Sequence, residues 1–396
     1  MKFNVSKLKF YLIIILVCLL TLYYHPFVID LPNIQITFLA PSINVVFGLL
    51  FIISFDLKNI QKSKVIIKLL SLILLIVLIL SFANMLFDFN YIGEIRALII
   101  PIFAIIIGWQ YKINENKLLI IIYLLIILTL YISLSHVFIN VGGFIIDQYK
   151  VFHKNTIGVI VSTSIILSLI LLLNTNTNKI LKIFLLLSIV FLLISLLTFR
   201  ARTATLVSIL FLIFILYKKF STRNVFFGGL GLIIFIIFLV LIIPDNAKNF
   251  VVDSFLQNTG DDITSGRSDI NKEAIYFLKD NLLIGNLKNT AKNIEWVHNY
   301  PLLKIFEFGL FFSFPILLMY LYLLFTLIKE NLKKDIFNIY NAGFVILLIP
   351  FAISMAEPTF PYGPGTATIF NFILFGISLR YNYQISKINT ISPKQY

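Results

Sequence analysis

The sequence predicts an all-α polytopic membrane protein, and two observations lead to this fold class. First, 59% of the 396 residues are hydrophobic and only 13% are charged, whereas soluble domains are usually about 45–50% apolar. Second, apolar stretches of about 20 residues recur along the whole chain, which is the length that a helix needs to cross a bilayer. Because backbone groups in lipid must bond within their own segment, such long runs predict helices and not barrel strands.

Taken in order, the apolar runs predict about twelve transmembrane helices. They lie at residues 10–28, 36–55, 65–87, 92–109, 118–139, 156–173, 180–199, 203–219, 225–243, 301–328, 337–356 and 366–380. No small-residue cleavage site follows the first run, so we expect a retained helix and not a removed signal peptide. Cys18, the single cysteine, lies within it, which leaves no disulfide and no thiolate metal site.

The connections between these runs alternate in charge. One set, which includes both ends of the chain, holds 20 Lys and Arg against four acids, and the opposite set holds 12 against 14. By the positive-inside rule, the basic set is cytoplasmic, so we expect both termini in the cytoplasm. The net charge of +14 is thereby explained as a topology signal, and we expect no nucleic-acid partner.

This topology divides the chain into three parts. Residues 1–243 form transmembrane helices 1–9, residues 244–300 form one long outer loop with a short amphipathic helix, and residues 301–396 form helices 10–12 and a cytoplasmic tail. The amphipathic helix is expected from Ser268, a possible cap, to Gly285, with an apolar stripe at Ile270, Ala274, Phe277 and Leu278. Such a helix could cover the outer end of the bundle as a lid, with Arg267 just before its start.

Arginines are enriched on the expected outer side, where positive charge is disfavoured. The cytoplasmic set has 18 Lys and 2 Arg, but the outer set has 8 Lys and 4 Arg, namely Arg96, Arg200, Arg202 and Arg267. A guanidinium binds phosphate or carboxylate in a bidentate way that an ammonium cannot. We therefore expect an anionic ligand, although each arginine alone could be an interfacial anchor. If a helix begins at Thr203, Arg202 lies at its N-terminus, where free N–H groups also attract anions.

Other polar residues collect at the same expected outer mouth. Asn155 or Thr156 could cap the helix that follows, and His153 and Lys154 read as solvated loop residues. His298, Asn299, Glu307 and Glu357 lie at the ends of outer segments. Two local ion pairs are plausible alternatives to functional roles: Lys304 with Glu307, and Arg96 with Glu94. The sequence holds no P-loop, no dinucleotide-binding turn and no Cys/His cluster, so we expect no cofactor and a substrate that arrives already activated.

The order of these short motifs resembles the O-antigen ligase and polymerase superfamily. They are the arginine motif at residues 198–204, Arg267 near a helix in the long loop, and His298-Asn299 followed, after nine intervening residues, by Gly309 within E-F-G. The H-K-N-T-I-G stretch at 153–158 resembles the opening of an earlier family helix. The resemblance covers roughly residues 150–330. Ligases commonly have Gly or Thr where this chain has Phe312, which favours the polymerase branch.

The resemblance implies a GT-C-like, metal-independent glycosyltransferase on the outer face of the bacterial cytoplasmic membrane. It would polymerise undecaprenyl-diphosphate-linked repeat units of O-antigen or capsule. Its expected partners are the lipid-linked glycan donor, a glycan acceptor, membrane lipid and a chain-length regulator. The assigned residues are His298, Arg202 and Arg267 for catalysis, and Arg200, Asn299, Glu307, Asn155, Arg96 and Glu357 for substrate binding.

Three alternatives stay open. An O-antigen ligase would transfer the glycan to lipid A-core and differ only in its acceptor. A lipid-linked oligosaccharide flippase would need charged residues deep in several spans, and the span middles carry almost none. A non-catalytic scaffold for envelope assembly would leave the outer arginine bias unexplained.

Overall fold

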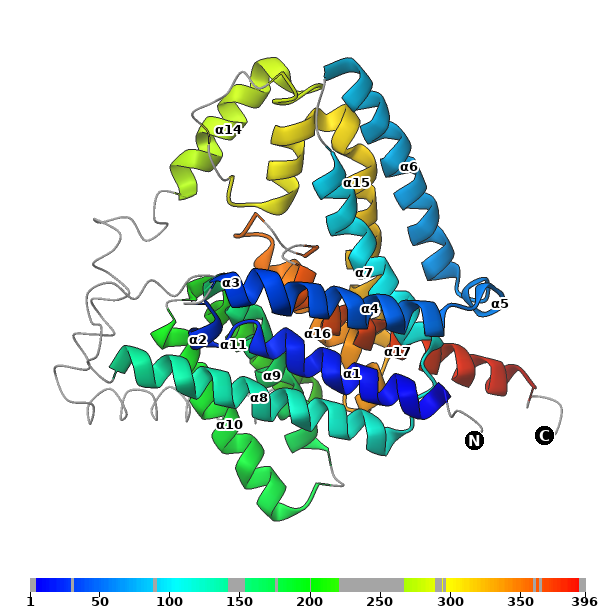
Figure 1. Cartoon of the computed structure of the whole chain (residues 1–396), viewed down its shortest axis with the longest axis vertical. Coiled ribbons are helices and arrows are strands. Elements are labelled where there is room, and N and C mark those ends of the chain that lie inside the picture. The colour runs from blue at the N-terminus through cyan, green and yellow to red at the C-terminus, as the bar shows by residue number, and fades with distance from the viewer. Residues whose placement is uncertain are drawn as a thin grey trace.

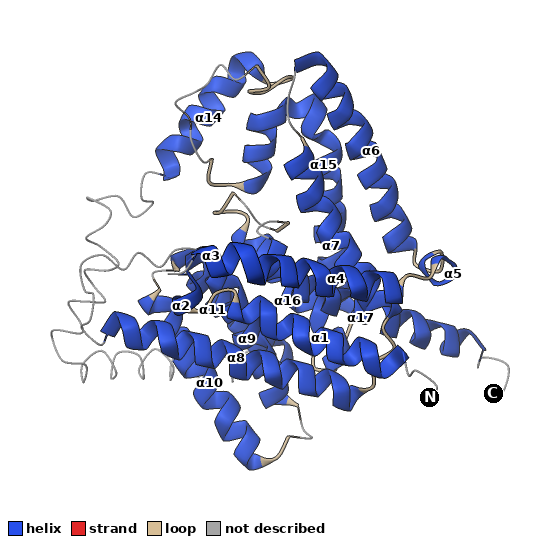
Figure 2. Cartoon of the chain, in the orientation of Figure 1, coloured by secondary structure: helices blue, strands red, loops and turns tan. Residues whose placement is uncertain are grey.

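The protein is all-helical in the part that the structure describes (Figures 1 and 2). This computed structural model describes residues 5–29, 32–87, 91–141, 154–174, 177–199, 201–220, 267–288, 294, 297–358, 361–362 and 365–391. Arg200, His153 and the predicted span 225–243 lie outside the described residues, as do Glu295 and Trp296 and most of the predicted long loop.

The first half of the chain contributes the helices α1 (Val5–Leu22), α2 (Pro26–Ile29), α3 (Pro32–Ile34), a π-helical turn (Gln35–Leu39), α4 (Ala40–Ser54), α5 (Leu57–Ile60), α6 (Lys64–Phe87), α7 (Ile92–Gln110), α8 (Glu115–Val141), α9 (Lys154–Leu173) and α10 (Lys179–Thr198). The second half contributes α11 (Arg202–Lys219), α14 (Arg267–Asn281), α15 (Tyr300–Lys333), a 3-10 turn (Ile339–Asn341), α16 (Ala342–Ile353) and α17 (Gly365–Ile391). Each predicted span within the described residues overlaps at least one helix, although the spans 10–28, 301–328 and 337–356 each cross a helix end or a break.

Eight of the described helical segments are long and apolar enough to cross a membrane, which makes this a multi-pass membrane architecture. They are Val5–Leu22, Gln35–Ser54, Lys64–Phe87, Ile92–Gln110, Glu115–Val137, Asn155–Leu173, Lys179–Thr198 and Tyr300–Lys333. Helices α11, α16 and α17 are shorter or more polar, so a total of twelve spans stays a prediction. The ends marked N and C lie at the same side of the view in Figure 1.

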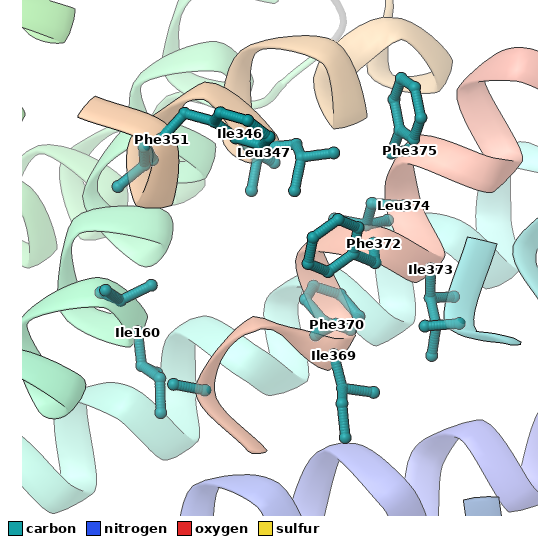
Figure 3. Close-up of a cluster of buried hydrophobic side chains, with 14 of the residues drawn as sticks. Ile160, Ile346, Leu347, Phe351, Ile369, Phe370, Phe372, Ile373, Leu374 and Phe375 are labelled. Atoms are coloured by element: carbon teal, nitrogen blue, oxygen red, sulfur yellow. The ribbon is translucent and has the colours of Figure 1, made fainter. Parts of the chain in front are cut away.

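The centre of the bundle is formed by α9, α16 and α17. Figure 3 shows Ile160 of α9, Phe351 of α16 and Phe372 of α17 within one apolar cluster, and all three side chains are buried. Helix α17 also packs along α7. The outer helices instead expose apolar side chains, such as Leu78 of α6 and Leu187 of α10. Such exposure suits lipid, which solvates apolar groups without cost.

Interhelical hydrogen bonds fix α9 within this apolar surrounding. The Ser208 hydroxyl of α11 donates to the Ser162 hydroxyl of α9 (2.8 Å), and the amide of Asn371 on α17 donates to Thr163 of α9 (3.1 Å). Small polar side chains of this kind let membrane helices approach closely and hydrogen-bond across their interface. Helix α9 is therefore held between α11 and α17, and its first turn is positioned beside the first turn of α11.

Candidate functional site

Helix α15 is broken near its start by Gly309, and this break positions the candidate site. Gly309 has φ +68°, so residues 300–308 form a short first arm and residues 310–333 a longer second arm. The two arms meet at a sharp bend in Figure 1. A side chain at Gly309 would meet the carbonyl oxygen of Leu283 at 2.3 Å, so glycine is required both for the φ angle and for the space. The predicted continuous span 301–328 is thus two segments.

The turn after α14 supplies the hydrogen bonds that the break in α15 leaves open. The N–H of Asn286 donates to the Phe306 carbonyl and the N–H of Leu310 donates to the Leu282 carbonyl, each at 2.7 Å. Gly285, with φ +59°, lies against Gly309 at the centre of this contact. Because buried backbone groups need partners, the turn and the break stabilise each other. Helix α14 is thereby attached to α15 at its C-terminal end.

A second attachment is made by residues 354–358, which follow α16 and are called here the Glu357 loop. The N–H of Tyr300 donates to the Ser354 carbonyl (2.9 Å), and the side-chain amide of Asn299 donates to the Met355 carbonyl (3.0 Å). Oδ1 of the same Asn299 side chain accepts a hydrogen bond from the N–H of Leu302 and thereby caps the N-terminus of α15. The first arm of α15 therefore begins directly on the Glu357 loop.

Glu357 joins two of the predicted residues that lie far apart in the sequence. Its Oε1 is 2.7 Å from Nη1 of Arg267, the first residue of α14, and its Oε2 accepts a hydrogen bond of 2.7 Å from the amide of Asn155 on α9. Nη1 of Arg267 also donates to the Ala356 carbonyl (3.0 Å). The Glu357 side chain is only 4% exposed, so its charge requires these partners.

Helix α11 begins at Arg202, beside the first turn of α9. A side chain at Gly158 of α9 would lie 2.7 Å from Cβ of Ala204 and 3.3 Å from Cβ of Ala201, so glycine permits this close contact. Asn155 is three residues before Gly158. The packing of Gly158 therefore brings the segment of Asn155 and the start of α11 together.

His298 lies between α14 and the first arm of α15. Its backbone N–H donates to Oδ1 of Asn271 (3.0 Å), and its imidazole Nδ1 is buried without a hydrogen-bond partner among the described residues. Burial lowers the pKa of His298 below its ordinary value, and the positive charge of Arg267 lowers it further. A neutral imidazole near neutral pH can accept a proton, which is what a general base requires.

A separate charged cluster lies on the first arm of α15. Nζ of Lys304 is 2.7 Å from Glu307 and 2.9 Å from Glu94 at the start of α7. The expected Lys304–Glu307 pair is therefore present, and it includes Glu94 as a second carboxylate. Arg96 is exposed on α7, and among the described residues Glu94 forms its ion pair with Lys304 and none with Arg96. Glu307 is held by Lys304, and no contact between Glu307 and His298 is found in the described part of the chain.

Sequence reasoning overlooked several groups of this site. Asn271 could have been predicted from the sequence, because it lies four residues after Arg267 and therefore on the same face of a helix. The roles of the Met355 and Ala356 carbonyl groups could not have been predicted, because any residue type presents the same backbone. The structure also places the rings of Tyr300 and Tyr362 edge-to-face, with centroids 5.6 Å apart and both hydroxyls buried without a described partner.

The site thus joins Asn155, Arg267, Asn299 and Glu357 through direct hydrogen bonds and ion pairs, with His298 beside Arg267 and Arg202 at the neighbouring helix start. Glu307 belongs to the separate Lys304 cluster, and Arg96 stands apart from both. In the comparisons with known proteins, no family model and no curated protein sequence matches this chain.

Proposed function

We propose that the protein is an integral-membrane glycosyltransferase that polymerises undecaprenyl-diphosphate-linked oligosaccharide repeat units on the outer face of the bacterial cytoplasmic membrane. One observation carries the proposal. The motif residues Asn155, Arg267 and Asn299, which come from three separate segments, all bind the Glu357 loop. An arginine, a histidine with a lowered pKa and a carboxylate that is 4% exposed thereby lie on adjoining segments, and a perturbed titratable group near a charged partner is typical of functional sites.

Arg267 is suited to an anionic leaving group. Its Nη1 is bound to Glu357 and Ala356, while Nε and Nη2 have no bond to a described residue. A guanidinium has five N–H donors, so three remain for phosphate oxygens. Arg202, at the first turn of α11, and Arg200 would add further positive charge. In this proposal they stabilise the charge that develops on the diphosphate as its bond to the sugar breaks.

His298 would receive the proton of the attacking hydroxyl. The acceptor oxygen forms a bond to the anomeric carbon of the donor, and the bond from that carbon to the diphosphate oxygen breaks. The electron pair of that bond leaves with undecaprenyl diphosphate, the acceptor proton passes to the imidazole, and solvent later removes it. Asn155, Asn299 and Glu357 would bind sugar hydroxyls or hold the arginine in place, while Glu307 and Arg96 remain candidates for sugar binding at the rim.

A ligase would use the same chemistry with lipid A-core as acceptor. Position 312 favours a polymerase, because ligases of the family commonly carry a small residue there. In this chain Phe312 is 5% exposed and packs edge-to-face against Phe87 of α6. The orientation in the membrane rests on the charge of the loops, which supports cytoplasmic termini and an outer site.

The proposal is tested by the surface glycans of a strain that lacks this protein. We expect single repeat units on an otherwise complete anchor, and restoration of the ladder by the wild-type chain but not by His298→Ala. Lipid-linked polymer that never reaches lipid A-core would assign the ligase reaction instead. An unchanged ladder would contradict both enzymes, and accumulation of lipid-linked repeat units on the cytoplasmic side would indicate a flippase.

A further inference from the structure

The inward face of α14 does more than cover apolar surface. Arg267, Asn271, Ala274 and Leu278 follow one another at intervals of four, three and four residues, so they lie along one face of the helix. Ala274 and Leu278 are buried, and Ala274 packs with Val297 and with Phe306 of α15. The polar half of the same face, Arg267 and Asn271, contacts the Glu357 loop and the His298 backbone.

The backbone at His298 is fixed on each side. Val297 before it is 0% exposed in the apolar contact with Ala274 and Phe306. Asn299 after it caps α15 and binds the Met355 carbonyl. Between them, the N–H of His298 has one described partner, Oδ1 of Asn271 at 3.0 Å. The bond to Asn271 is therefore the described hydrogen bond that ties the N–H of His298 itself to α14.

We infer that Asn271 is a positioning residue, which holds the His298 backbone so that the imidazole stays beside the Arg267 guanidinium at the reaction centre. The inference rests on the proposed function. Both Arg267 and Asn271 belong to one turn of α14, so this helix sets the spacing between the group that accepts the proton and the group that binds the leaving diphosphate. Reacting groups that are displaced by about 1 Å can lose about a hundredfold in rate.

The residue type at this position is also informative. An aspartate would accept the same bond from the His298 N–H, but it would place a negative charge one turn from Arg267. Such a charge would compete with phosphate for the guanidinium and would favour the protonated imidazole. Asparagine provides the acceptor without the charge, so Arg267, which already pairs with Glu357, meets no second carboxylate, and the base stays neutral.

The experiment compares Asn271→Leu, Asn271→Asp and the control Asn281→Ala in purified, detergent-solubilised full-length protein with a lipid-linked repeat unit. Asn281 is on the same helix, and its amide binds only its own helix at Phe277 in the described part of the chain. We expect Asn271→Leu to lower kcat about a hundredfold with KM within about twofold. Asn271→Asp should keep more activity than the leucine variant, and its acid limb should move to higher pH. Asn281→Ala should match the wild type.

Wild-type kcat in a folded Asn271→Leu variant would overturn the inference, as would an unchanged pH profile in Asn271→Asp. The aspartate variant keeps the test decisive if the leucine variant does not fold. His298→Ala in the same assay separates this inference from the proposed function. If His298→Ala stays active, the assigned base is wrong, and if only the Asn271 variants behave as wild type, the positioning role alone is wrong.

Discussion

Two charged clusters adjoin the first arm of α15, and they are built differently. Each joins distant parts of the chain: Asn155 binds Glu357 across 202 residues, and Lys304 binds Glu94 across 210. In the Lys304 cluster the ammonium lies between two carboxylates, and its side chain is 7% exposed. The Glu357 cluster, also called here the reactive cluster, consists of Glu357, Arg267 and Asn155, with His298 near Arg267. Its carboxylate is the buried member, and the Arg267 side chain is 27% exposed.

This difference separates a structural cluster from a reactive one. Lys304 has three N–H donors, and two bind the carboxylates from α7 and α15, so little of it is left for a ligand. Among the described residues, Arg267 bonds through Nη1 alone, and Nδ1 of the His298 imidazole has no hydrogen-bond partner. A group that is fully paired inside the protein stabilises the fold, whereas one that is half-paired and partly exposed can bind something else. The comparison predicts that changes in the two clusters affect different quantities.

The largest effect is expected from Arg267→Lys. Lysine keeps the positive charge near Glu357 but loses the planar fork that would bind two phosphate oxygens. We expect kcat for glycan transfer to fall by about a factor of 10²–10³, the usual consequence of removing one donor to a developing oxyanion. The thermal midpoint should change little. Lys279→Ala on the exposed face of α14 serves as control, and wild-type turnover in Arg267→Lys would remove Arg267 from the reactive cluster.

A smaller effect, on stability and not on chemistry, is expected from Lys304→Met. Removal of the ammonium leaves Glu94 and Glu307 facing each other without their cation, and because these carboxylates are 17% and 36% exposed, we expect a loss of about 1–3 kcal/mol in the free energy of unfolding. Thermal unfolding in detergent measures this loss. The combined variant Lys304→Met, Glu94→Gln, Glu307→Gln should recover much of it, because the uncompensated charges are gone. A single variant as stable as the wild type would show that this cluster does not hold α7 against α15.

Gly309→Ala should lower the free energy of unfolding by about 2 kcal/mol. Alanine at φ +68° is strained, and its Cβ would meet the Leu283 carbonyl. The turn at residues 282–287 would separate from α15, which moves α14 and its Arg267 away from Glu357. Activity should therefore fall together with the unfolding midpoint. Gly48→Ala on α4, where a Cβ meets nothing within 4 Å, is the matched control, and equal midpoints for the two variants would contradict the role of the break.

The two clusters and the helices around them also show which features of the structure could be predicted from the sequence. Long apolar runs predicted the membrane helices, because hydrophobic length is a local property. The stripe from Ile270 to Leu278 predicted α14, but both of its ends differ from the prediction. The helix begins at Arg267, one residue before Ser268, and it ends at Asn281, four residues before Gly285. The Lys304–Glu307 pair was likewise found from its spacing of three residues and is confirmed.

What the sequence could not show depends on tertiary contacts. Glu94 was expected beside Arg96, but Lys304 takes it, because the first arm of α15 folds against α7. Gly309 was noticed only as part of a motif. Its positive φ depends on the turn at residues 282–287, which supplies the missing hydrogen bonds. The Glu357 loop binds through the carbonyls of Met355 and Ala356, which have no signature in a sequence.

The smallest expected effect is a shift in the titration of His298. Because burial and Arg267 both lower its pKa, the imidazole is neutral at pH 7 and becomes protonated only below its ordinary value of about 6.5. The acid limb of kcat/KM should therefore have its midpoint below 6.5, with activity lost as the pH falls through it. Neutralising Arg267 as Arg267→Gln removes the smaller of the two causes, so the pKa should rise only part of the way back.

This shift is best measured on the imidazole itself, since Arg267→Gln is expected to be nearly inactive. The chain has four histidines, and comparison with His298→Ala assigns the signal of His298 in an NMR titration of the purified protein. Arg96→Gln, an exposed arginine on α7, controls for a general change of surface charge and should leave the titration unchanged. If Arg96→Gln and Arg267→Gln shift the His298 titration equally, the coupling is a long-range field effect. The two residues would then not act as one reactive cluster, and the contrast with the Lys304 cluster would lose its electrostatic basis.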